Sequence, residues 1–79
     1  MPQSIDDIVV EIIDGNLHLI CDGCLDGESA QDLEADLMKV IGGKVVVIGQ
    51  PTATVIIPNC TTPKLIEAKG LLFDYLSGA

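Results

Sequence analysis

The sequence has very few aromatic residues and no arginine. Tryptophan is absent, and Phe73 and Tyr75 are the only phenylalanine and tyrosine among 79 residues. Because 48% of the residues are nevertheless hydrophobic, the core has to be built from aliphatic side chains. Four lysines stand against 12 acidic residues, which gives a formal net charge of −8 at pH 7.

The charges are unevenly distributed along the chain. Residues 1–38 contain ten acids and no base, whereas all four lysines lie at position 39 or later. A field of this sign repels nucleic acids and anionic lipid surfaces. We therefore expect no direct nucleic-acid binding and no membrane binding, and we keep a basic protein as an alternative partner.

Long apolar runs and export signals are also missing. No apolar run approaches the ~18 residues of a membrane span, and no basic residue precedes the first apolar run, as it would in a signal peptide. Three cysteines allow at most one disulfide, which is typical of a reducing compartment. The sequence predicts a cytoplasmic protein, with residues 1–79 forming one small α+β domain.

The first hairpin is predicted from residues 5–13 and 16–21. Asp14-Gly15 between them favours a two-residue type I′ turn, which pairs Glu11 with His18. In this register one face of the hairpin is wholly apolar and the other is mixed, so the turn and the hydrophobic pattern agree.

A helix is predicted after the loop at residues 22–28. Ser29 and Asp32 resemble a capping box, with Asp26 as the alternative cap. The apolar positions recur at helical spacing, and Gly42-Gly43 ends the helix. They are Ala30, Leu33, Leu37, Val40 and Ile41.

The second hairpin is predicted at residues 45–48 and 54–57, two β-branched runs joined through Gly49 and Pro51. Thr62-Pro63 then predicts the start of a second helix that ends at Ser77-Gly78. The order ββα-ββα predicts a four-stranded, mainly antiparallel sheet with both helices packed on one face. The strand order stays open, as does a variant in which the second hairpin pairs with a partner chain.

This architecture predicts a homodimer. The second hairpin is apolar on both faces, and two helices on one face leave the other uncovered. Val46, Ile48 and Ile56 share the uncovered face and are the predicted interface residues. The competing arrangement places the helices on opposite faces, which would bury both sides within a monomer.

The cysteines suggest a different kind of protein. His18, Cys21 and Cys24 have ligand-like spacing, and Cys60 could complete a zinc site, although a second close pair of ligands is missing. Cys21 and Cys24 could instead be a redox pair, but the neighbouring carboxylates disfavour the thiolate form.

No arrangement of residues predicts catalysis, because no nucleophile, base and orienting group occur together around the single histidine. The leading hypothesis is a non-catalytic protein-interaction or regulatory module that acts as a homo-oligomer without a cofactor. The alternatives are a thiol or zinc protein and an acidic inhibitor that docks to a basic, nucleic-acid-binding protein.

Overall fold

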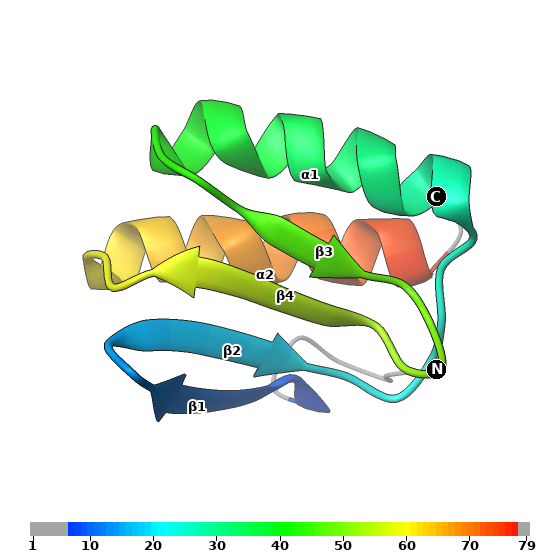
Figure 1. Ribbon diagram of the computed structural model, residues 1–79, viewed down its shortest axis with the longest axis horizontal. Coiled ribbons are helices and arrows are strands. Elements are labelled where there is room, and N and C mark those ends of the chain that lie inside the picture. The colour runs from blue at the N-terminus through cyan, green and yellow to red at the C-terminus, as the bar shows by residue number, and fades with distance from the viewer. Residues whose placement is uncertain (1–6, 78–79) are drawn as a thin grey trace.

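The fold is α+β, as the element order predicts. The computed structural model describes residues 7–77. The elements are β1 (Val9–Ile13), β2 (Asn16–Ile20), α1 (Gly27–Ile41), β3 (Val46–Ile48), β4 (Thr54–Pro58) and α2 (Thr62–Leu76). The four strands form one antiparallel sheet in the order β1-β2-β4-β3, so that the second strand of each hairpin lies in the centre of the sheet (Figure 1).

The first hairpin has the register that the sequence predicts. Ile13 pairs with Asn16 and Glu11 with His18. Asp14 and Gly15 have φ angles of 52° and 79°, the positive values that a type I′ turn requires. β1 begins at Val9, later than expected, and the first two residues of the predicted strand lie outside the described part of the chain.

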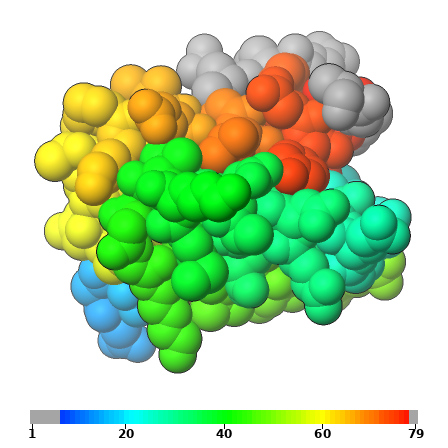
Figure 2. Space-filling model, turned by 90° about the horizontal axis from the view of Figure 1, so that it is seen from above, coloured from blue at the N-terminus to red at the C-terminus, as the bar shows by residue number. Residues whose placement is uncertain are grey.

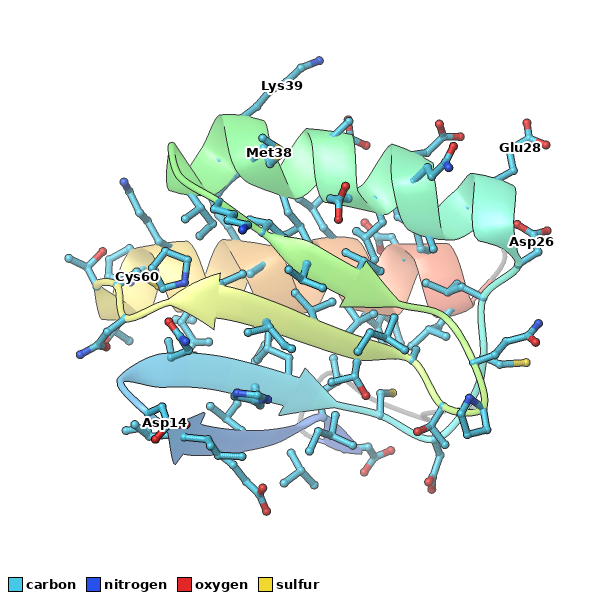
Figure 3. The ribbon with its side chains drawn as sticks, in the orientation of Figure 1. Asp14, Asp26, Glu28, Met38, Lys39 and Cys60 are labelled. Atoms are coloured by element: carbon cyan, nitrogen blue, oxygen red, sulfur yellow. The ribbon has the colours of Figure 1, made fainter. Side chains whose placement is uncertain are left out.

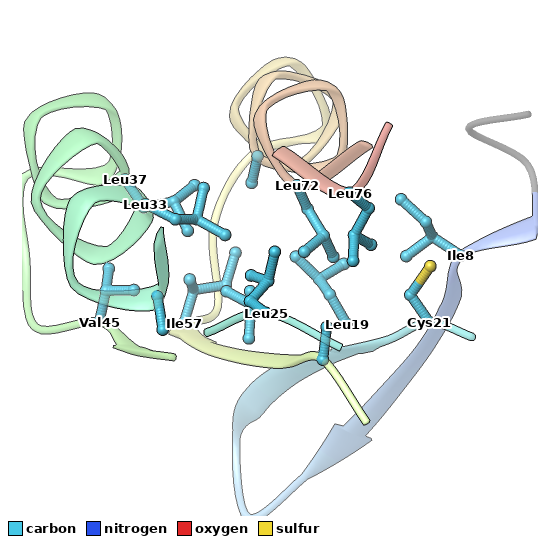
Figure 4. Packing of buried hydrophobic residues seen from close by; sticks show 14 of the residues in the cluster. Ile8, Leu19, Cys21, Leu25, Leu33, Leu37, Val45, Ile57, Leu72 and Leu76 are labelled. Carbon is cyan, nitrogen blue, oxygen red and sulfur yellow. The ribbon is translucent and has the colours of Figure 1, made fainter. Parts of the chain in front are cut away.

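Both helices pack on the same face of the sheet, so the competing arrangement with one helix on each face is not formed. In Figure 1 the strands lie in front and the helices behind them. Leu33 and Leu37 of α1 and Leu72 of α2 have no exposed surface, and they meet Leu19 and Ile57 from the sheet (Figure 4). The core contains no buried polar or charged side chain among the described residues, as an aliphatic composition implies.

The loops that enter α1 and leave β3 are joined by backbone hydrogen bonds. The amide of Leu25 donates to the carbonyl of Gly49 (2.8 Å), and the amide of Ala53 donates to the carbonyl of Gly23 (2.8 Å). A Cβ at Gly49 would collide with the carbonyl oxygen of Leu25, so this approach requires glycine. The junction fixes the loop that carries Cys24.

The predicted cap of α1 is wrong by one turn. The helix begins at Gly27, and Asp26 is the capping residue, whose Oδ1 accepts a hydrogen bond from the amide of Ser29 (2.7 Å). Ser29 therefore lies within the first turn, where its amide is one of the donors that the cap satisfies. The other end is as expected, because Gly42 has a φ of 75° and its amide donates to the carbonyl of Met38 (2.8 Å).

The start of α2 differs from the prediction by one residue. Thr61 is the capping residue, although its side chain makes no capping hydrogen bond, and Pro63 lies in the first turn. At the other end the amide of Ser77 donates to the carbonyl of Phe73 (2.9 Å). Gly78, the expected terminator, lies outside the described residues.

Leu37→Ala should lower the free energy of unfolding by roughly 2–5 kcal/mol, because it leaves a cavity in a fully buried site between α1 and the sheet. Met38 is the matched control, since 46% of its surface is exposed on the same helix. Chemical denaturation of both variants checks the prediction. A loss for Leu37→Ala no larger than that for Met38→Ala would show that α1 buries a different face.

Asp26→Ala should lower the melting temperature at neutral pH, because the amide of Ser29 loses its acceptor. That amide, and then the Ser29 hydroxyl, lowers the pKa of Asp26 below its ordinary 3.8. The carboxylate therefore stabilises the fold above pH 3.8, and this contribution is lost as the pH falls through the folded-state pKa.

Thermal melts from neutral pH down to about pH 2 check this, and the wild-type and Asp26→Ala curves should converge at the acid end. Asp22→Ala is the control, because Asp22 is an exposed acid in the same loop that does not cap the helix. A difference in melting temperature that stays constant across the pH range would contradict the electrostatic origin of the effect.

Candidate functional site

The surface of the sheet opposite the helices, here called the open face, faces the viewer in Figure 1. The strand registers arrange its side chains in three rows that cross the strands. The first row holds Val9, Ile20, Thr54 and Ile48, the second holds Glu11, His18, Ile56 and Val46, and the third holds Ile13, Asn16 and Pro58.

The open face is largely apolar. The exposed fractions of Val9, Ile13, Val46 and Ile48 are 54%, 43%, 38% and 44%, while Ile56 is half-buried between its neighbours. The three residues predicted as an interface therefore lie together on one face. The four exposed residues occur on both outer strands, so the apolar surface extends across the sheet.

One end of the open face is hollowed into a pocket of about 320 Å³. Its lining consists of Asn16, Lys44, Val46, Ile56, Ile57 and Pro58. Lys44 precedes β3 by two residues and brings a positive charge to this largely apolar pocket. Sequence reasoning missed Lys44, because its position beside Asn16 depends on the pairing of β2 with β4.

Few charged groups lie on the open face. Glu11 and His18 are direct neighbours across β1 and β2, and Lys44 lies toward the opposite edge at β3. The face is thus polarised across the strands, with a carboxylate at one side and an ammonium group at the other. His18 has Ile56 as its neighbour on β4, so a side chain that could act as its nucleophile does not lie there.

The structure does not bring the four candidate zinc ligands together. Cys21 is buried on the helix side just after β2, whereas the His18 side chain belongs to the open face. Cys24 is exposed in the loop that follows, and Cys60 comes after the other end of β4 (Figure 3). Within residues 7–77, no three His, Cys, Asp or Glu side chains are grouped so that they could hold a metal ion.

The Cys21 thiol is held in its protonated form. Burial raises its pKa, and the nearby carboxylate of Asp22 raises it further. The direction agrees with the expectation from the acidic loop, although burial is the larger cause. A thiol with a raised pKa is a poor nucleophile at neutral pH, and this environment does not suit a redox pair with Cys24.

A contact between the helices involves a residue that sequence reasoning did not single out. The Tyr75 hydroxyl donates a hydrogen bond of 2.6 Å to Oδ2 of Asp36, which joins α2 to α1. This bond to a carboxylate raises the pKa of Tyr75 to about 12. The sequence alone could have indicated that Tyr75 has a hydrogen-bond partner, because a half-buried tyrosine usually needs one for its hydroxyl. It could not have identified Asp36 as that partner, because this depends on how the two helices pack.

No helix within the described residues is long and apolar enough to cross a membrane. In comparisons with known proteins, no family model, no curated protein and no solved structure matches this chain. The open face is therefore the feature of the molecule from which a function can be argued.

Proposed function

We propose that this protein is a small, non-catalytic interaction module that acts as a homodimer, in which two copies stack the open faces of their sheets. The observation that carries the proposal is the apolar open face. Contiguous exposed apolar surface of this kind marks interfaces, because removing it from water is favourable. Closed two-fold dimers are the commonest assembly of soluble oligomers.

The second copy is the occupant that the chemistry of the face favours. Stacked sheets lie about 10 Å apart with their strands nearly aligned, and alternate side chains interdigitate. Branched aliphatic residues on both outer strands supply such a surface to each partner. The exposed acids of α1, such as Glu28 and Asp32, lie on the far side of the sheet and would stay in water.

The charges on the open face select one orientation of the two copies. A two-fold axis that runs across the strands would place Glu11 over the Glu11 of the other copy. An axis along the strands places β1 of one copy over β3 of the other, so that Glu11 lies over Val46 of the other copy. Lys44 of that copy is two residues from Val46, about 7 Å along the chain. The second arrangement pairs opposite charges, and we propose it as the geometry of the dimer.

We also propose a cytoplasmic location, and separate observations support it and the non-catalytic role. His18 is flanked by Glu11 and Ile56, an arrangement without a nucleophile for the imidazole to activate. Cys21, Cys24 and Cys60 are all free thiols, which suits a reducing compartment.

Ile56→Lys and Val46→Glu should convert the dimer to a monomer. Ile56→Lys places a charge on a central strand in the middle of the stacked faces. Val46→Glu places a carboxylate over Glu11 of the other copy. Light scattering at micromolar concentration should give twice the 8.3 kDa of one chain for the wild type and 8.3 kDa for the variants. Circular dichroism checks that both variants keep their fold.

Ile66→Lys is the matched control, because Ile66 is a 57% exposed isoleucine on α2, away from the sheet. It should leave the dimer intact. A wild-type mass of one chain would contradict the proposal, and dissociation by Ile66→Lys alone would move the interface to the helices.

A charge exchange tests the orientation. Glu11→Lys and Lys44→Glu should each weaken the dimer by about tenfold in Kd, because each replaces an attraction with a repulsion. The double variant should recover most of the affinity, since it restores opposite charges across the interface. Sedimentation of the four proteins provides the comparison, and additive losses in the double variant would rule out the axis along the strands.

A further inference from the structure

The two outer strands of the sheet, β1 and β3, differ in how well their free edges are protected. β3 has three residues and β1 has five, and both present one backbone side that no strand of the sheet occupies. Edge strands of this kind can pair with another chain, and proteins usually protect them. A difference in protection between the two edges therefore points to a difference in role.

The β3 edge is protected by α1. Val47 and Val55 form a pair in which the backbone groups of Val47 point away from β4. The Val47 amide donates instead to Oε1 of Glu34 on α1, at 3.4 Å. Figure 2 shows α1 along this side of the molecule, where it hinders the approach of another strand.

The β1 edge follows the opposite pattern. Ile13 and Asn16 flank the two-residue turn and form a hydrogen-bonded pair, so Glu11 and Val9 also bond to β2. The amides and carbonyls of the intervening residues, Val10 and Ile12, then point outward. β1 lies at the border of the sheet in Figure 1, and among the described elements it packs mainly against β2.

Four of the five side chains of β1 are also exposed, all except that of Val10. Ile12 belongs to the helix side of the sheet, yet 71% of its surface is exposed, because the tip of the hairpin extends away from the helices (Figure 4). Val9 and Ile13, on the open face, are 54% and 43% exposed. An added strand would pair with the outward backbone groups of β1, and apolar residues on its helix side would cover Ile12.

The charge of this edge determines which strand it accepts. Glu11 lies at the centre of β1 and Asp14 follows its end, within a segment, residues 1–38, that contains no lysine or arginine. The neighbour of Glu11 on β2 is His18. A second copy paired antiparallel along the full strand would place Glu11 directly opposite Glu11, which is unfavourable. A strand with lysine or arginine opposite Glu11 gains an attraction at the same position.

We propose that the β1 edge is a strand-addition site for an extended segment of a partner protein in which apolar residues alternate with basic ones. The segment extends the sheet through the outward backbone groups of Val10 and Ile12, and a basic side chain pairs with Glu11. The edge remains accessible when the open faces of two copies stack, so the site does not depend on the dimer.

The test uses a fluorescent, seven-residue peptide of alternating valine and lysine, titrated into the full chain. When the concentration of free peptide is about ten times its dissociation constant, amide hydrogen exchange at Val10 and Ile12 should slow about tenfold. The Glu11 amide, which is already bonded to β2, should change little. A peptide with two adjacent central amides N-methylated cannot extend the ladder and should not bind, and a peptide with glutamate in place of lysine should bind at least about tenfold more weakly.

Ile12→Pro should abolish binding of the peptide, because it removes an outward amide without breaking a bond to β2. Ile12→Val keeps that amide and should bind within about twofold of the wild type. The exchange measurement is made on the wild type, so it tests the proposal even if Ile12→Pro does not fold. Absence of binding up to millimolar peptide would overturn the proposal. So would binding without slower exchange at Val10 and Ile12, or binding that survives N-methylation.

Discussion

Two helices can cover only one face of a four-stranded sheet, and in this protein both lie on the same face. Leu19, Val55 and Ile57 are therefore buried beneath α1 and α2, while the alternate residues of the same strands remain on the open face. Because β1, β3 and β4 are apolar at most positions on both faces, the face that folding leaves uncovered is still largely apolar. The fold thus completes one core and leaves a surface that a second copy can cover, which is the basis of the proposed dimer.

The distribution of charge gives the remaining surfaces different characters. Most carboxylates in the first half of the described chain lie on the loop before α1 and on α1 itself, while Glu11 lies on β1 and Asp14 in the turn that follows it. Within residues 7–77, the open face therefore has Glu11 at one side and Lys44 at the other. One carboxylate, Glu34, covers the β3 edge. The β1 edge has no equivalent contact among the hydrogen bonds of the described residues, and its acidic character favours a basic strand. A face for self-association and an edge for a partner are compatible roles for one small sheet.

Local signals predicted most of the fold, and tertiary contacts account for what they missed. The Asp14-Gly15 turn predicted the register of the first hairpin, and the alternation of residues predicted that Val46 and Ile56 share a face. Each of these two features depends on residues that are close in the sequence. The cap of α1 was predicted at Ser29 instead of Asp26, because both residues have suitable side chains and the entry path of the chain selects between them. The pairing of β2 with β4 was beyond prediction, and so were the features that depend on it. These are the separation of Cys60 from Cys21 and the place of Lys44 beside Asn16.

The central claim, that a second copy covers the open face, is tested most directly by the solvent access of isoleucine methyl groups in solution. Ile20, Ile48 and Ile56 lie on the open face, Ile57 lies in the core, and Ile66 is exposed on α2. In methyl NMR with a soluble paramagnetic agent, we predict that the three open-face methyl signals broaden as little as that of Ile57, while Ile66 broadens strongly. Open-face signals that broaden as strongly as that of Ile66 at micromolar protein concentration would contradict the dimer.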